Sequence, residues 1–187
     1  MCGFVVTSDV ANTELMLRKQ EFRGPDAQSF YKDSFVGMGH ALLDINGERQ
    51  IQPYKTKNGN YIVFNGEMYD TTIPNDTEYL ANGLETYGTD FLVHNDWHGS
   101  LVWYKPKEQE IFLVRDQFGA KPLWFYRRGT KFTITTSLRS ILNGEPDNTH
   151  EQVYRLNALM EGSECTIKDC IKVAPGQYFV LNLKNKT

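Results

Sequence analysis

The chain has 187 residues and a net charge of −3, and 40% of its residues are hydrophobic and 13% aromatic. This composition is typical of a folded protein with a substantial core, and the acidic balance without a basic run argues against a nucleic-acid-binding surface. Three cysteines provide no disulfide framework, and no apolar run reaches the roughly 18 residues of a membrane span, so we expect a cytoplasmic protein that does not contact a membrane.

The first part of the chain combines apolar β-rich runs with turn signals. A short polar–apolar segment that follows Asn12 and Thr13, two good N-cap residues, predicts the first helix. In chain order we expect a strand over residues 3–8, a helix over 12–20, a turn at 23–26, a hairpin of 28–31 with 36–43, and a strand over 61–64.

The remainder of the chain begins with a helix expected over residues 76–87, with Asp76 as its N-cap and Gly88 as its C-terminal stop. Next we expect strands over residues 100–104, 111–115, 123–126 and 132–136, helices over 137–142 and 150–160, and a strand over 177–183. Closely spaced strands favour antiparallel sheets and the separate helices favour covering layers, which together predict one α+β domain over residues 1–187.

Cys2 is the first candidate for chemistry. If Met1 is removed, the thiol and the new α-amine belong to one residue, and the amine can take the thiol proton near neutral pH and later return it to a leaving group. The alternative is a cysteine of no functional importance at the start of an edge strand. One residue cannot decide between these interpretations.

A series of short motifs favours the catalytic interpretation of Cys2. In order, they are Met1-Cys2-Gly3, Arg23-Gly24-Pro25-Asp26, Gly39-His40, Gln52-Pro53, Asn65-Gly66-Glu67-Met68-Tyr69, Asp76-Thr77-Glu78, Arg115-Asp116-Gln117-Phe118-Gly119-Ala120-Lys121-Pro122-Leu123 and Pro175-Gly176. This ordered set resembles class II glutamine amidotransferase domains, most closely the glutaminase half of asparagine synthetase B. The resemblance covers nearly the whole chain and implies the N-terminal nucleophile hydrolase fold, a four-layer αββα sandwich of two antiparallel sheets.

The resemblance also implies a reaction. Cys2 would attack the side-chain amide of L-glutamine, and water would hydrolyse the resulting thioester to glutamate after ammonia leaves. The Asn65 side chain and the Gly66 N–H match the family's oxyanion hole, in which each donor stabilises the transition state by roughly 3–4 kcal/mol. Read without the family, Asn-Gly is a tight turn after a strand, and such a turn would itself expose N–H groups.

Glu67 and Asp76 match family positions that hold the substrate, and two carboxylates suit its α-ammonium group. Asp76 has the alternative role of a helix N-cap alone. Arg23 and Asp26 are expected to brace the site through an internal ion pair, and the Phe118–Leu123 run is expected to be a structural turn.

One departure from the family lies after His40, where Leu42 replaces an arginine that grips the α-carboxylate of glutamine. The candidate substrate-binding residues on this segment are Leu42, Ile45 and Arg49. Three interpretations are open: Arg49 substitutes for the missing arginine, the substrate lacks that carboxylate, or the site is impaired. Loss of such a pair weakens binding by roughly 10- to 1,000-fold.

No cofactor or metal is expected. His94 and His98 are spaced like a pair of metal ligands, but no further ligand lies near them in the sequence. Cys165 and Cys170 are expected to be ordinary thiols.

No phosphate-binding loop is present, so the chain is expected to pass ammonia to a separately encoded ATP-dependent synthetase or other amidating partner. Two other functions remain alternatives. One is an N-terminal nucleophile amidohydrolase for a different amide, and the other is a catalytically silent regulatory domain.

Overall fold

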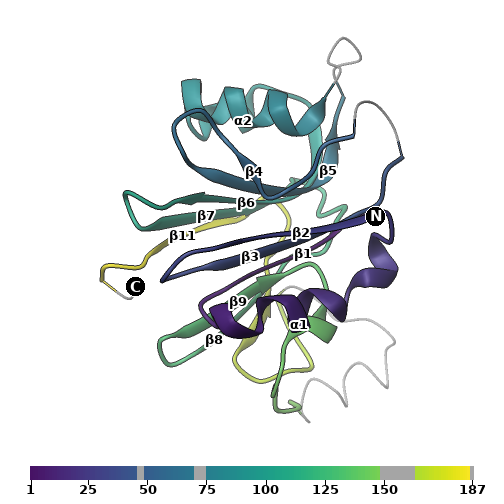
Figure 1. Cartoon of the computed structure of the whole chain (residues 1–187), viewed down its shortest axis with the longest axis vertical. Coiled ribbons are helices and arrows are strands. Elements are labelled where there is room, and N and C mark those ends of the chain that lie inside the picture. The colour runs from purple at the N-terminus through teal and green to yellow at the C-terminus, as the bar shows by residue number, and fades with distance from the viewer. Residues whose placement is uncertain (46–48, 70–74, 148–162, 186–187) are drawn as a thin grey trace.

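The computed structural model describes residues 1–45, 49–69, 75–147 and 163–185. Two antiparallel sheets are stacked face to face, with α2 on the outer side of one and α1 on the outer side of the other (Figure 1). The predicted αββα sandwich is therefore confirmed. In the described residues, no helix is long and apolar enough to span a membrane.

The first sheet, sheet A, contains the N-terminal strand near its middle. Val5 in β1 and Ala41 in β3 pack against Met16 and Leu17 of α1, which covers the outer face of the sheet. In spatial order its described strands are β10 (Cys170–Lys172), β8 (Trp124–Arg128), β9 (Lys131–Thr135), β1 (Gly3–Thr7), β3 (Gly37–Leu42) and β2 (Ala27–Lys32).

The second sheet, sheet B, carries α2 on its outer face. Leu80, Ala81 and Leu84 of α2 pack on apolar side chains of its central strands, among them Ile62 and Leu101. In spatial order its described strands are β11 (Tyr178–Asn182), β7 (Glu110–Arg115), β6 (Trp97–Lys105), β5 (Tyr61–Met68) and β4 (Tyr54–Lys55).

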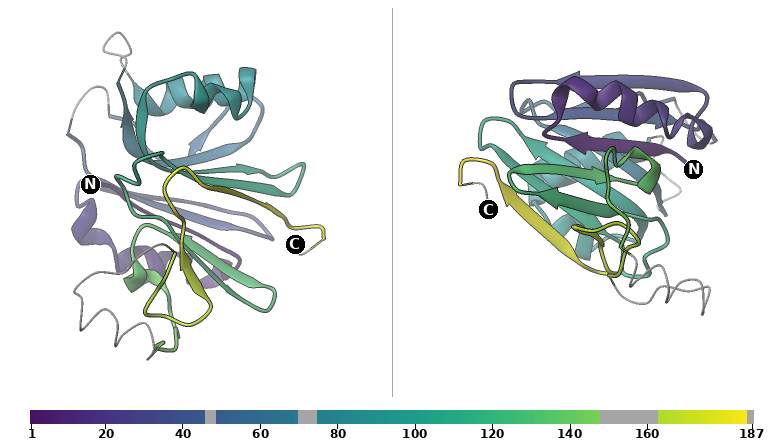
Figure 2. Two further views of the ribbon diagram at one scale, coloured as in Figure 1. Left: turned by 180° about the vertical axis from the view of Figure 1, so that it is seen from behind. Right: turned by 90° about the horizontal axis from the view of Figure 1, so that it is seen from below.

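The space between the sheets is filled by alternate side chains of the strands, because successive strand residues point to opposite faces. Phe4 and Val6 of β1 share one buried cluster with Val63 of β5 and with Val102 and Tyr104 of β6. The inter-sheet face is thereby defined for each of these strands. The two views of Figure 2 show the same stacking from behind and from below.

Most expected elements are present, with shifted ends. The helices of the described residues are α1 (Thr13–Arg18), α2 (Asp76–Tyr87) and the short α3 (Asp90–Val93), with 3-10 turns at Val10–Asn12, Glu21–Arg23 and Leu138–Ser140. The helix expected over residues 137–142 is wrong, since only the last of those 3-10 turns forms there. The helix expected over residues 150–160 lies outside the described residues.

The N-cap assigned to α2 is also wrong by one residue. Asn75 caps the helix, because its side-chain oxygen accepts a hydrogen bond from the Glu78 N–H at 2.8 Å. Asp76 is the first helical residue instead, and its carboxylate is free to bond elsewhere.

Candidate active site at the start of β1

Cys2 lies just before β1, next to the segment that leaves β3. The Leu43 N–H donates to its Sγ at 3.4 Å, and the thiol points back to the Leu43 carbonyl oxygen at 3.7 Å. Burial raises the pKa of the Cys2 thiol, while the positive charges of Arg23 and Lys121 oppose that rise. Continued alternation along β1 places Cys2 on the same side as Phe4, facing sheet B.

The Arg23–Asp26 run fixes this corner of the molecule. Gly24 crosses β3 so closely that a Cβ would lie 2.1 Å from the Ala41 carbonyl oxygen, so only glycine fits. Arg23 donates from Nε to the Cys2 carbonyl oxygen at 3.2 Å, and the Asp26 carboxylate accepts the Asp44 N–H at 2.7 Å. The expected Arg23–Asp26 ion pair is wrong. In the described structure Arg23 bonds to the backbone of Cys2, and Asp26 bonds to the backbone of Asp44.

Asn65 and Gly66 do not form the turn that the Asn-Gly pair suggests. Both lie within β5, opposite Ser100 and Gly99 of β6. Asn65 shares its face of β5 with Val63, so its side chain points into the space between the sheets, where it is only 2% exposed. Its Nδ2 has no hydrogen-bond partner among the described residues.

The Gly66 N–H points to the open edge of β5. Amides of alternate residues in a strand point to the same side, and on this side the Phe64 N–H bonds to the Gln52 side chain and the Met68 N–H bonds to Asp76 at 3.0 Å. Gly66 lies between them, and in the described residues β4 pairs with β5 only as far as Ile62. The Gly66 N–H is therefore a backbone donor facing away from the ladder.

Asp76 and His98 meet close to Glu67 at the end of β5. Burial raises the pKa of Asp76, and the nearby negative charge of Glu67 raises it further, while the Met68 N–H and His98 lower it. Glu67 and His98 are opposite each other in the β5–β6 ladder. The charges of Glu67 and Asp76 thus influence each other, and their role in binding a substrate stays a prediction.

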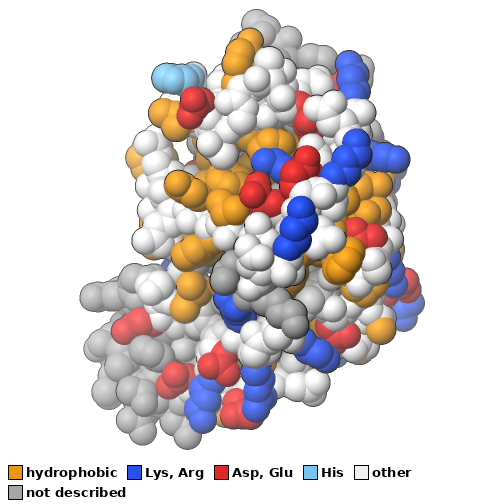
Figure 3. Space-filling view, turned by 90° about the vertical axis from the view of Figure 1, so that its left-hand side faces the viewer, with side chains coloured by type: hydrophobic (Ala, Val, Ile, Leu, Met, Phe, Trp, Pro, Cys, Tyr) orange, Lys and Arg blue, Asp and Glu red, His pale blue; other side chains and the backbone are white. Residues whose placement is uncertain are grey.

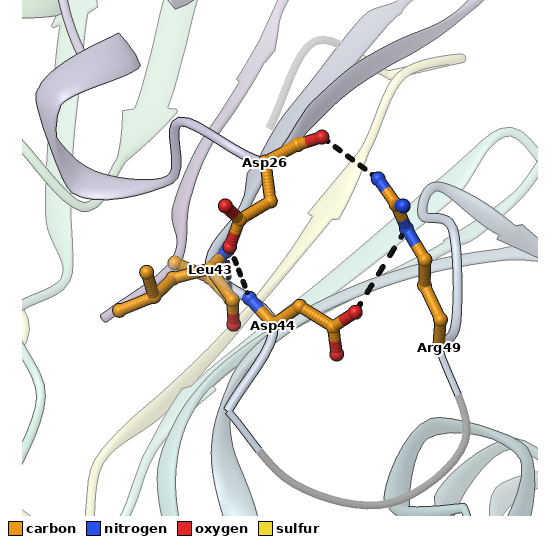
Figure 4. A network of polar contacts seen from close by, with 5 residues as sticks. Asp26, Leu43, Asp44 and Arg49 are labelled. Atoms are coloured by element: carbon orange, nitrogen blue, oxygen red, sulfur yellow. Dashed lines mark hydrogen bonds and ion pairs between the residues drawn. The ribbon is translucent and has the colours of Figure 1, made fainter.

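The segment after β3 contains the three residues that bear on the missing arginine. Leu42 is buried and follows His40 by two residues, on the inter-sheet face, while Ile45 is 62% exposed. Arg49 donates to the Asp26 carbonyl oxygen at 2.7 Å and forms a 3.9 Å ion pair with Asp44 (Figure 4). Asp26 and Asp44 thus hold the guanidinium at the surface. Asp44 directly follows Leu43, whose N–H contacts the Cys2 thiol.

The Phe118–Leu123 run forms a turn, as predicted, and the preceding Arg115 and Asp116 hold it. The Arg115 guanidinium binds the carbonyl oxygens of Lys121 and Val173, both at less than 3 Å. The fully buried Asp116 carboxylate accepts N–H groups from Gly99, Phe118 and Ala120. Because Gly99 belongs to β6, this turn fixes the strand that faces Asn65.

Sequence reasoning missed several polar groups around this site. In the described residues, the buried atoms without a partner include Arg23 Nη2, Asn65 Nδ2, His98 Nδ1 and Ser100 Oγ. His40 is also fully buried on the inter-sheet face, and burial lowers its pKa to about 4. Only alternation along each strand, with register, brings these side chains together, and the sequence alone does not give register.

The opposite end of sheet B has a polar pocket of a different kind, of about 510 Å³. Two of its charged groups have partners: Glu85 accepts from Asn60 at 2.8 Å, and Lys105 pairs with Glu110 at 3.1 Å. Figure 3 shows this face, where acidic and basic side chains gather. No cluster of three metal-ligating side chains forms in the described parts of the chain.

A family model described as a glutamine amidotransferase domain matches residues 1–187. The chain belongs to that family. A solved structure of glutamine phosphoribosylpyrophosphate amidotransferase from Bacillus subtilis matches 98% of the chain and 48% of its own length, with a TM-score of 0.68 and 15% identity. That likeness identifies the N-terminal nucleophile hydrolase fold of class II amidotransferases.

Curated relatives of this amidotransferase domain include synthetases and amidases. "Asparagine synthetase [glutamine-hydrolyzing] 3" of Bacillus subtilis is 28% identical over 143 residues, covering 67% of the chain and 23% of the relative. "Amidase chry2" of Gibberella zeae is 25% identical over 183 residues, covering 84% of the chain and 26% of the relative. The chain therefore spans about a quarter of the length of these relatives.

Proposed function

We propose that this amidotransferase domain hydrolyses the side-chain amide of L-glutamine to glutamate and ammonia, with Cys2 as the nucleophile. The observation that carries the proposal is the pair of unused donors on β5. Asn65 Nδ2 is buried without a partner, and the adjacent Gly66 N–H faces away from the ladder. Two donors preorganised in a water-poor site are what a developing oxyanion requires.

The chemistry follows from these positions once Met1 has been removed. The new α-amine of Cys2 takes the thiol proton, and the thiolate attacks the amide carbon of glutamine. The carbonyl oxygen becomes an oxyanion held by Asn65 and Gly66. The protonated amine then gives its proton to the departing ammonia, which leaves a thioester that water hydrolyses to glutamate and the free thiol.

Burial of the Cys2 thiol matters for this step. Burial raises the pKa of the thiol and so disfavours the thiolate, which is why a base that takes the thiol proton is needed. Arg23 and Lys121 are the nearby cations that favour the thiolate when it forms. Lys121 lies in the turn to which sequence reasoning gave only a structural role, so it joins the proposed site as an electrostatic neighbour.

Substrate binding is assigned to Glu67 and Asp76 for the α-ammonium group and to Arg49 for the α-carboxylate. Asp76 does not serve as the N-cap of α2, which leaves its carboxylate available. Leu42 is an apolar wall beside Cys2 and cannot bind an anion. Arg49 is a cation on the same segment, held at the surface by Asp26 and Asp44.

The proposal is tested with protein that lacks Met1 and with a diazoketone analogue of glutamine, which alkylates thiols. Intact mass should increase by one adduct at Cys2, glutamine should prevent the increase, and Cys2→Ser should abolish it. Cys165 and Cys170 are internal controls, because both thiols are buried in a separate cluster. Absence of labelling at Cys2 would favour a silent regulatory domain.

A second function is an amidohydrolase for an amide other than glutamine. Leu42 favours it, since a substrate without an α-carboxylate would need no cation at that position, and two relatives of the chain are named amidases. Labelling of Cys2 that glutamine does not prevent would support this alternative.

The ammonia requires an acceptor. Relatives named glutamine-hydrolysing asparagine synthetases are about four times as long as the matched region. For this domain we propose that a separately encoded ATP-dependent synthetase or amidating partner receives the ammonia. Native mass spectrometry of the protein purified from its source cell tests this: a complex is expected, and an isolated monomer with full glutaminase activity would argue against a partner.

A further inference from the structure

Ser100 differs from the other buried hydroxyl groups of the described structure. It is completely buried, and its Oγ has no hydrogen-bond partner among the described residues. The other buried Ser and Thr hydroxyls there all take part in hydrogen bonds: Thr7, Thr13, Thr56, Thr77, Thr133, Thr135, Thr136 and Ser140. An unpartnered buried hydroxyl costs stability, so its presence calls for a reason.

The register of sheet B places Ser100 directly opposite Asn65. Both side chains lie on the inter-sheet face, because Asn65 follows Val63 and Ser100 precedes Val102 by two residues each, and both valines belong to the inter-sheet cluster. Side chains of such a pair have Cβ atoms roughly 4.5–5.5 Å apart. Ser100 Oγ and Asn65 Nδ2 are thus two neighbouring donors that both lack a partner.

The backbone around Ser100 is held on both sides. Ser100 is paired with Asn65 in β5 and with Arg115 in β7. The preceding residue, Gly99, donates its N–H to the buried Asp116 carboxylate at 2.9 Å. The hydroxyl can therefore turn only about its own side-chain bonds, which is the preorganisation that electrostatic stabilisation of a transition state requires.

We propose that the Ser100 hydroxyl is a further donor to the oxyanion, beside the Asn65 amide. The Ser100 Oγ–H and the Asn65 Nδ2–H bind the same oxygen as the thiolate adds to the amide carbon and the C=O bond becomes a C–O⁻ bond. The inference rests on the proposed glutaminase function. It also explains why neither donor is satisfied inside the protein: the partner is the reacting oxygen.

The test compares Ser100→Ala with Ser140→Ala in protein without Met1. Ser140 is equally buried, but its hydroxyl donates to the Met16 carbonyl oxygen at 2.7 Å. Ser100→Ala should lower kcat for glutamine on the order of 10²-fold with little change in KM, while its Tm stays level or rises. Ser140→Ala should keep its kcat and lose about 2–4 °C in Tm.

Ser100→Cys, nearly isosteric and a weaker donor, should fall between wild type and Ser100→Ala in kcat. Wild-type activity with an equally active Ser100→Ala would overturn the role of Ser100 and leave the glutaminase proposal standing. A fall in Tm for Ser100→Ala like that of Ser140→Ala would identify a structural hydroxyl and likewise overturn it. A wild-type protein that does not hydrolyse glutamine would overturn both proposals.

Discussion

Two polar side chains on the same face of β6 have opposite surroundings. At one end Ser100 has no partner for its hydroxyl among the described residues. Four residues further on, the Tyr104 hydroxyl donates to Asp33 at 2.8 Å, and Asp33 also accepts the Tyr31 hydroxyl at 3.0 Å. Asp33 further accepts the N–H groups of Phe35 and Val36, so it ties both sheets to the turn after β2.

The two ends of the sandwich are therefore built for different purposes. At the Asp33 end the carboxylate accepts four hydrogen bonds, and the arrangement stabilises the fold. At the Cys2 end, buried donors on β5 and β6 have no partner among the described residues, which costs stability and leaves binding capacity for a ligand. A substitution at the Cys2 end should consequently lower activity and leave stability unchanged, and a substitution at the Asp33 end should do the reverse.

Asn65→Ala has the largest expected effect at the proposed active-site end. Removal of one proposed oxyanion donor should reduce kcat for glutamine by about 10²–10³-fold, and the Tm should stay level because Asn65 Nδ2 has no partner to lose among the described residues. Steady-state kinetics and thermal unfolding measure both effects.

Asn60→Ala is the matched control for that variant. Asn60 precedes β5 at its other end and donates to Glu85 at 2.8 Å, so its loss should lower the Tm and keep kcat. An Asn65→Ala protein that loses stability and keeps full activity would contradict the division between the two ends.

Asp33→Ala is the corresponding variant at the Asp33 end of the sandwich, where we expect stability to change. A hydrogen bond to a charged group contributes about 1.5–3 kcal/mol net. Because water can replace part of the bonds of this partly exposed turn, we expect a loss of about 2–3 kcal/mol in the free energy of unfolding. The kcat of the folded variant should equal that of wild type. Denaturant unfolding measures the loss, and Tyr31→Phe, which removes one of the two hydroxyl bonds, should lose about 1 kcal/mol.

Arg49→Ala has the smallest expected effect and tests the edge of the active-site end. Because its guanidinium is about half exposed, its loss should raise the KM for glutamine by about tenfold and change kcat little. Lys131→Ala, at the turn between β8 and β9, is the control and should leave both values unchanged. An unchanged KM for Arg49→Ala would remove Arg49 from the substrate site.

Local sequence signals failed where a long-range contact took precedence. Asn65-Gly66 is a strong turn signal, yet it lies inside β5, because β6 supplies a pairing partner along its whole length. A Cβ on Gly66 would lie 2.0 Å from the His98 carbonyl oxygen. The glycine is thus required by the close approach of a neighbouring strand, which residues near it in the sequence do not reveal.

The same reason explains the errors at Asp76 and Arg23. Asn75 and Asp76 are both good N-cap residues. Asn75 caps the helix, because the Asp76 carboxylate accepts the Met68 N–H at the end of β5 instead. Arg23 turned to the Cys2 carbonyl oxygen, and Asp26 to the Asp44 N–H. Each partner is distant along the chain or fixed by the path of a neighbouring strand.

The sequence by itself determined the α+β character, the positions of most strands and the chemical type of the Cys2, Asn65 and Gly66 groups. Alternation of apolar residues and the identity of each side chain are local properties, so they can be seen without a structure. Only the tertiary structure decided which donors remain unused and which cation lies beside Cys2. Those facts depend on strand register and on the approach of two sheets, which bring together residues as distant as Cys2, Asn65 and Ser100.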